Sequence, residues 1–247
     1  MKNSGIFKET AANENKNLHK DSGGDISQFG GSHMICKNEA VTLYHGSKSG
    51  IHGAIAPISR ERCDFGKGFY MGTDRIQPLT LICNYPNARI YTLSVELSGL
   101  KILDVEIGLE WALLIAYHRG KMESVKSSPI YHYYADLSKD CDMVIGYIAN
   151  DRMFVVLDRF FNGEITDLAL INSLSALKLG KQYVALTDKA CNQIKIIDEQ
   201  ELTEDNRGKL KQESEANRSK GIAMADEICR KYRRDGQFFD EILKAGY

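Results

Sequence analysis

The sequence predicts an α+β fold, in which strands and helices of mixed order surround one core. Two segments, VTLYHGS (residues 41–47) and ARIYTLSVEL (88–97), alternate or cluster β-branched and aromatic residues between Gly, Pro and Asn, as strands do. Residues 104–119, DVEIGLEWALLIAYHR, begin acidic, keep apolar residues at helical spacing and end basic, which suits a helix dipole. This order of elements indicates a mixed α+β core with a C-terminal helical tail.

Four further segments extend this pattern. DMVIGYIA (142–149) is typical of a buried strand, and MFVVLDRFF (153–161) fits either a strand or the start of a helix. ITDLALINSLSAL (165–177) predicts a helix that stops near Gly180, because glycine commonly ends helices. QYVALTD (182–188) returns to a strand pattern.

The two ends of the chain differ from its centre. Residues 1–33 are polar, with isolated apolar residues of no period, and predict a flexible leader. The tetrapeptide Gly-Ser-His-Met at 31–34 looks like a cloning scar, although a natural tail is the alternative. The core domain is predicted over 34–198. Residues 199–247 are charged and predict a polar helix or linker followed by an amphipathic helix.

Composition narrows the function classes. The 247 residues are 43% hydrophobic and 26% charged, which excludes wholesale disorder, and the net charge of −1 gives no global attraction for nucleic acid or an anionic membrane. Six scattered cysteines without metal spacing suggest a reducing cytoplasm and no metal site. The apolar runs fall short of the roughly 20 residues that span a bilayer, and no secretory signal is visible. We therefore expect a cytoplasmic protein without a membrane partner.

The first candidate motif is LYHGS (43–47), in which a predicted strand ends at His45 and a Gly-Ser pair turns the chain away. A histidine at a sheet edge can bind a ribose hydroxyl without carrying a charge. The alternative is a histidine whose hydrogen bonds are satisfied by the adjacent turn.

The second motif is DFGKGFYMGTD (64–74). Gly66 and Gly68 allow the backbone to approach a ligand closely, and Phe69 and Tyr70 point to opposite faces of a short strand. A tyrosine ring can stack on the cationic nicotinamide of NAD⁺. The alternative is a glycine-rich turn with two core aromatics. A kinase is excluded, because the phosphate loop, strand lysine and H-R-D loop that accompany D-F-G in kinases are absent from the sequence.

LYHGS followed by DFGKGFYMGTD resembles the ADP-ribosyltransferase superfamily, specifically a bacterial branch of its histidine-tyrosine-glutamate type. The resemblance covers residues 41–198 and implies split, antiparallel-rich β-sheets with flanking helices, and NAD⁺ as a substrate between them. It implies that His45 binds the adenosine-side ribose, with Gly46, Ser47 and Gly68 beside the dinucleotide, and that Tyr70 stacks on nicotinamide.

The third family element is a glutamate at the start of a late core strand. QYVALTD is the corresponding strand by resemblance, and it opens with Gln182 instead. The amide oxygen can accept a hydrogen bond from a ribose hydroxyl, but it supplies no negative charge and cannot act as a base.

Several carboxylates could substitute for the glutamate. The candidates are Asp142, Asp151 and Glu164. Asp151 is favoured because the adjacent Arg152 can bind a pyrophosphate bidentately. A surface ion pair is the alternative, and it applies equally to Arg62 and Asp64. The predicted catalytic set is Tyr70, Gln182 and Asp151, with no metal.

These expectations converge on an NAD⁺-dependent ADP-ribosyltransferase that modifies an unidentified protein or nucleic acid. The alternatives are an NAD⁺ glycohydrolase and a non-catalytic module that binds NAD⁺ or ADP-ribose. Relatives by fold include many toxins, so a bacterial toxin with a dedicated inhibitor or antitoxin protein is expected by analogy. The basic RKYRRDGQFF (230–239) is expected to be a solvated helix face.

Overall fold

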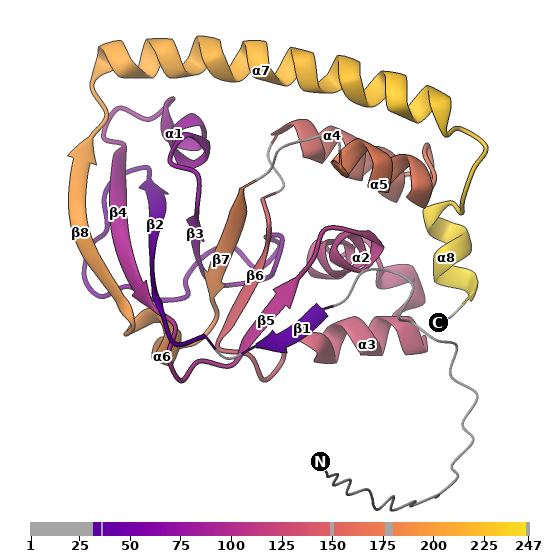
Figure 1. Cartoon of the computed structure of the whole chain (residues 1–247), viewed down its shortest axis with the longest axis horizontal. Coiled ribbons are helices and arrows are strands. Elements are labelled where there is room, and N and C mark those ends of the chain that lie inside the picture. The colour runs from indigo at the N-terminus through magenta and orange to yellow at the C-terminus, as the bar shows by residue number, and fades with distance from the viewer. Residues whose placement is uncertain (1–31, 36, 149–150, 176–179, 246–247) are drawn as a thin grey trace, which may run out of the picture.

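The computed structural model describes residues 32–35, 37–148, 151–175 and 180–245 (Figure 1). Most of the predicted leader lies outside these residues. Its last two residues, Ser32 and His33, begin a strand that pairs with residues 102–105.

The predicted α+β class is confirmed. The described strands, in chain order, are β1 (Ser32–Ile35), β2 (Ala40–Ser47), β3 (Phe69–Gly72), β4 (Arg89–Glu96), β5 (Ile102–Val105), β6 (Met143–Tyr147), β7 (Lys181–Ala185) and β8 (Ile194–Glu201). They form one eight-stranded sheet in the order β1-β5-β6-β7-β3-β2-β4-β8. All neighbouring strands are antiparallel except β5 and β6.

The sheet is nearly interrupted between β2 and β3. These two strands share a single register pair, Tyr44 with Gly72. On one side of this junction β2 pairs with β4 along its whole length, and on the other β3 pairs with β7. The structure therefore has one continuous sheet rather than two separate ones, with two halves that meet at one residue pair. We call β2-β4-β8 the outer half and β1-β5-β6-β7-β3 the central half.

Helices cover the sheet and extend beyond it. The described helices are α1 (Ile76–Ile82), α2 (Leu109–His118), the 3₁₀ helix η2 (Glu123–Val125), α3 (Pro129–Leu137), α4 (Asp151–Phe161), α5 (Asp167–Ser175), α6 (Asp188–Cys191), α7 (Glu204–Lys231) and α8 (Phe239–Ala245). The long α7 runs from the end of β8 past α1 to α4 and α5, so it crosses both halves (Figure 1). None of the described helices is long and apolar enough to cross a membrane.

The largest core lies under α2, α4 and α5. Trp111, Leu114 and Phe160 are fully buried there, against β5, β6 and β7. Phe239 of α8 joins this core, and its ring lies 5.3 Å from that of Phe160. The C-terminal tail therefore contributes core side chains, and the predicted boundary at residue 198 falls inside β8.

Three sequence-based expectations change. The helix predicted over 104–119 begins only at Leu109, because residues 102–105 pair with β1 and β6 as strand β5. MFVVLDRFF is helical as part of α4. The charged tail, predicted as a polar helix or linker followed by an amphipathic helix, forms one continuous helix, α7, to Lys231, and a separate helix, α8, follows at Phe239.

Candidate functional site

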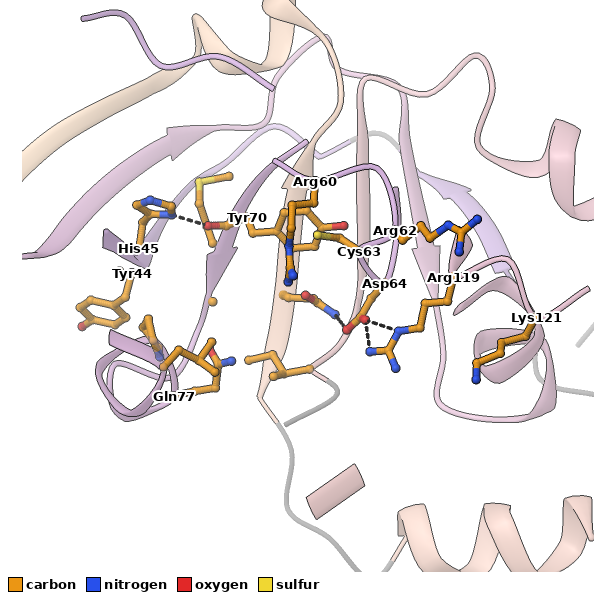
Figure 2. Close-up of a pocket in the computed structure, with 17 residues that line it drawn as sticks. Tyr44, His45, Arg60, Arg62, Cys63, Asp64, Tyr70, Gln77, Arg119 and Lys121 are labelled. Atoms are coloured by element: carbon orange, nitrogen blue, oxygen red, sulfur yellow. Dashed lines mark hydrogen bonds and ion pairs between the residues drawn. The ribbon is translucent and has the colours of Figure 1, made fainter. Parts of the chain in front are cut away.

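A pocket of about 530 Å³ opens at the junction between the two halves of the sheet. Both β2 and β3 line it, together with the start of β7, the segment 60–64, part of α1 and the residues that follow α2. The lining residues are Tyr44, His45, Gly46, Arg60, Arg62, Cys63, Asp64, Tyr70, Met71, Gly72, Gln77, Pro78, Leu81, Arg119, Lys121, Ile148 and Gln182 (Figure 2). His45, Tyr70 and Gln182, which the sequence analysis singled out, thus share one pocket.

His45 bridges the junction. Its Nδ1 donates a hydrogen bond of 2.7 Å to the backbone oxygen of Tyr70 (Figure 2). Its ring stacks on Phe69, with the ring centroids 4.3 Å apart. Its partner is therefore on β3 rather than in the adjacent Gly-Ser turn. Burial lowers the pKa of His45, so the ring is neutral at neutral pH. With Nδ1 as the donor, Nε2 keeps a lone pair that can accept a hydrogen bond.

Tyr70 is anchored through its hydroxyl. The hydroxyl donates to the Gly66 oxygen at 2.7 Å and accepts from the Phe65 amide at 3.1 Å. Burial raises the pKa of Tyr70, which keeps the hydroxyl protonated. These two bonds fix the ring at the pocket wall and also hold the loop that carries Asp64.

Gln182 is buried at the start of β7, and its amide group acts as a donor. Nε2 donates to the Tyr147 backbone oxygen at 3.0 Å and approaches Asp64 Oδ2 at 3.4 Å. Its Oε1 makes no hydrogen bond with any described residue. The amide therefore orients a carboxylate and leaves an acceptor oxygen available.

That carboxylate belongs to Asp64, which forms an ion pair with Arg119. Arg119 Nε donates to Oδ1 at 3.0 Å and Nη2 donates to the same oxygen (Figure 2). The two side chains are only 13% and 10% exposed, so this is not the surface ion pair considered for Asp64 from the sequence. Sequence reasoning missed Arg119, because a basic residue at the end of a helix already had an explanation in the helix dipole.

Three further cations line the pocket. Arg60, Arg62 and Lys121 are exposed and line the pocket, and none forms an ion pair with another described residue. Asp64 is the sole Asp or Glu among the described residues that line it. The described wall thus carries an excess of positive charge, which suits an anionic ligand such as a pyrophosphate.

The small residues assigned to NAD⁺ binding have contacts within the protein. A Cβ on Gly46 would lie 2.9 Å from the Pro78 oxygen, and one on Gly68 would lie 2.5 Å from Val184 Cγ1. These glycines therefore permit close packing onto α1 and β7. The Ser47 hydroxyl donates to the Gly50 oxygen at 2.8 Å. Ser47 and Gly68 line a second pocket of about 320 Å³, which shares His45 and Tyr70 with the first.

The carboxylates proposed to replace the glutamate have other positions. Asp142 precedes β6 and accepts hydrogen bonds from the Lys101 amide, Thr187 and Lys189 away from the pocket, so its role is structural. Glu164 is exposed between α4 and α5 and does not line the pocket. Neither side chain therefore lines the pocket that contains His45, Tyr70 and Gln182. Asp151 and Arg152 begin α4 rather than a turn, but their side chains lie outside the described residues.

Within the described part of the chain, no three or more His, Cys, Asp or Glu side chains are grouped so that they could hold a metal ion.

Comparison with known proteins identifies one family. The family profile described as "Protein of unknown function (DUF3990)" matches residues 41–196, which is more than half of the chain. No curated protein and no solved structure matches this chain. The matched segment runs from β2 into β8 and contains every described residue that lines the pocket.

Proposed function

We propose that this chain, which belongs to the DUF3990 family, uses NAD⁺ as a substrate and transfers its ADP-ribose to an acceptor. One observation carries the proposal. His45, Tyr70 and Gln182 are far apart in the sequence and were each selected for a different contact with NAD⁺, yet all three line the same pocket. They are on the three neighbouring strands β2, β3 and β7, whose pairing brings them to this pocket.

The pocket wall supplies groups suited to each part of the dinucleotide. His45 Nε2 is an acceptor for a ribose hydroxyl, because Nδ1 is already committed as a donor. The face of Tyr70 can stack on the cationic nicotinamide, a contact worth about 0.5–2 kcal/mol. Arg60 can bind the pyrophosphate through its planar guanidinium.

The chemistry requires an anion beside the sugar. When the bond between the ribose carbon and the nicotinamide nitrogen breaks, the electron pair leaves with nicotinamide and positive charge develops on the ribose. Asp64 is the anion in this account, and Gln182 orients it from 3.4 Å. Gln182 Oε1 accepts a hydrogen bond from the ribose hydroxyl. The two roles of the ADP-ribosyltransferase glutamate, the hydrogen bond and the negative charge, are thus divided between Gln182 and Asp64.

The pairing of Asp64 with Arg119 supports a second candidate function. A carboxylate that already accepts hydrogen bonds from a guanidinium has less charge to offer a transition state. A non-catalytic module that recognises NAD⁺ or ADP-ribose would keep the same pocket without turnover, and a glycohydrolase would use water as the acceptor.

Nicotinamide release separates these functions. We expect the wild type to release nicotinamide from NAD⁺, and Asp64→Asn to release it at least about tenfold more slowly. Asp136→Asn, which makes the same change at an exposed position of α3, is the matched control and should behave as the wild type. Release that is stimulated by cell lysate indicates a transferase, and release that is not indicates a glycohydrolase.

Binding measurements cover the case in which Asp64→Asn fails to fold, which circular dichroism would reveal. Tyr70→Ala should weaken NAD⁺ binding in calorimetry by about 1–3 kcal/mol. Binding without release by the wild type favours the non-catalytic module. If the wild type neither binds NAD⁺ nor releases nicotinamide, the proposed use of NAD⁺ is overturned.

The cytoplasmic location and the toxin role belong to the same proposal. If NAD⁺ consumption harms the cell, expression of the wild type in a bacterial cytoplasm should slow growth more than equal expression of Asp64→Asn. An inhibitor protein would then be found as a second gene product that restores growth. Equal growth with both chains would argue against the toxin role.

A further inference from the structure

The two sides of the pocket differ in charge. Tyr44 and His45 lie at one side, whereas Arg62 and Lys121 lie beyond Asp64 at the other (Figure 2). In the proposed function the adenosine-side ribose is bound at His45 and the bond that breaks is near Asp64. Arg62 and Lys121 are therefore on the side from which an acceptor would approach.

These two cations are available to a ligand. Both are exposed, and neither forms an ion pair with another residue of the described part of the chain. Arg119, in contrast, is already paired with Asp64. Figure 2 shows the Arg62 and Lys121 side chains well separated from one another. A spread pair of cations suits a chain of anionic groups better than one compact group.

The Asp64 side of the pocket is also poorly equipped to remove a proton from an acceptor, because the neutral imidazole of His45 lies at the other side (Figure 2). Asp64 accepts hydrogen bonds from Arg119 and from Gln182, and it is the only carboxylate among the described lining residues. A hydroxyl or amine acceptor must lose a proton during transfer. A phosphate monoester is already anionic at neutral pH, because its second pKa is about 6. Such an acceptor needs no general base.

From these observations we infer that the acceptor is the terminal phosphate of a nucleic-acid strand, held by Arg62 and Lys121; the inference rests on the proposed function. A strand end offers a monoester as the nucleophile and neighbouring diesters for the second cation. The net charge of the chain is −1, so this attraction is local to the pocket mouth.

The transfer step balances without a further reactant. A terminal phosphate oxygen forms a bond to the ribose carbon as the bond from that carbon to nicotinamide breaks. The bonding pair leaves with nicotinamide, whose ring becomes neutral. The product is an ADP-ribosyl ester of the strand, and no proton is transferred.

The test offers NAD⁺ and the protein two single strands of the same sequence, one with a 5′-phosphate and one with a 5′-hydroxyl. Mass spectrometry should detect one ADP-ribose on the phosphorylated strand alone, and added salt should reduce the yield. Arg62→Gln combined with Lys121→Gln should lower the yield about tenfold or more. Lys126→Gln, an exposed lysine outside the pocket, is the matched control and should keep the yield.

The outcomes separate a failure of the acceptor assignment from a failure of the proposed function. Nicotinamide release without modification of either strand would overturn this inference and leave the proposed function standing, as would equal modification of both strands. If a phosphoserine peptide is modified faster than the phosphorylated strand, the acceptor is a protein phosphate, and this inference is also overturned. No nicotinamide release and no NAD⁺ binding would overturn the proposed function, and this inference with it.

Discussion

The outer and central halves of the sheet are built in different ways. In the outer half, β2 and β4 pair over eight consecutive residues, from Ala40 with Glu96 to Ser47 with Arg89. In the central half the strands have only four or five residues, but β6 is almost completely buried, with Val144 in the core under the helices and Met143 and Ile145 in a second core formed mostly by strand residues. The outer half thus has a long ladder in addition to buried side chains such as Leu43 and Leu93, whereas the short strands of the central half depend more on their core.

This difference explains where the pocket forms. The halves meet at one register pair, and the His45 side chain supplies a further hydrogen bond across the junction. Where a ladder ends, side chains and backbone groups become available to a ligand. The outer half contributes His45, and the central half contributes Asp64, Arg119 and Gln182. In our account the outer half binds the adenosine-side ribose through His45, whereas the central half, which carries Tyr70 and Gln182, binds the nicotinamide end and acts on it.

The largest expected effect is a loss of stability in the central half. Trp111 is fully buried, and its Nε1 donates to the Tyr147 oxygen that also accepts from Gln182. Trp111→Ala should lower the free energy of unfolding by about 3–5 kcal/mol in urea titrations. Ile197→Ala, at an exposed position on β8, should change it by less than about 0.5 kcal/mol. Similar values for the two variants would contradict the idea that this core supports the central half.

The next effect concerns the ion pair inside the central half. Removing one partner of a buried pair costs about 3–5 kcal/mol, and residual exposure of both side chains puts Asp64→Asn near the lower value. Arg119→Gln should cost a similar amount. A double-mutant cycle by thermal or urea unfolding should then show clear coupling between the two changes. Fully additive effects would mean that the pair contributes nothing as a pair.

Each half also contains a histidine that titrates below its usual range. Burial lowers the pKa of His118 in the central half to about 4 from 6.5, and it lowers the pKa of His45 in the outer half. The unfolded chain then binds protons that the folded chain does not, so stability should be full above pH 6.5 and fall as the pH drops below it. Between pH 6.5 and 5 the loss from His118 should be about 2 kcal/mol. His118→Gln should flatten the profile, and an unchanged slope would contradict this assignment.

The smallest expected effect concerns the Tyr70 hydroxyl, which lies close to the junction between the two halves. Tyr70→Phe keeps the ring but leaves the Phe65 amide and the Gly66 oxygen without their partner. Stability should fall by about 1–3 kcal/mol, near the lower value because the loop can reach water. NAD⁺ affinity should stay close to that of the wild type in calorimetry. Loss of affinity as large as that of Tyr70→Ala would show that the hydroxyl, and not the ring, binds the ligand.

Local sequence patterns predicted much of the fold but not all of it. The strands at 41–47 and 88–97 and the helix within 104–119 have clear periodicity, and each appears in the structure. Strand β8 was not predicted, because its side chains are mostly exposed and charged and it is defined only by pairing with β4. The join between the sheet halves was also hidden, because it depends on one contact between Tyr44 and Gly72.

The site residues also differ in whether the sequence could predict them. His45, Tyr70 and Gln182 belong to short motifs and could be selected from the sequence. Asp64 and Arg119 are 55 positions apart, and their pairing arises only when the segment after α2 folds beside the glycine loop. An ion pair buried by tertiary packing leaves no local signal, which is why the sequence points to Asp142, Asp151 and Glu164 as candidate carboxylates instead of Asp64.

Nicotinamide release by Gln182→Glu tests the central claim most directly. If Asp64 is the anion of the site, a second carboxylate within hydrogen-bonding distance of it repels it and raises one of the two pKa values. Release should then fall about tenfold or more relative to the wild type. Gln193→Glu, the same change at a residue outside the pocket, is the matched control and should leave release unchanged. Faster release by Gln182→Glu would contradict the account, because it would mean that residue 182, and not Asp64, is where the site needs its negative charge.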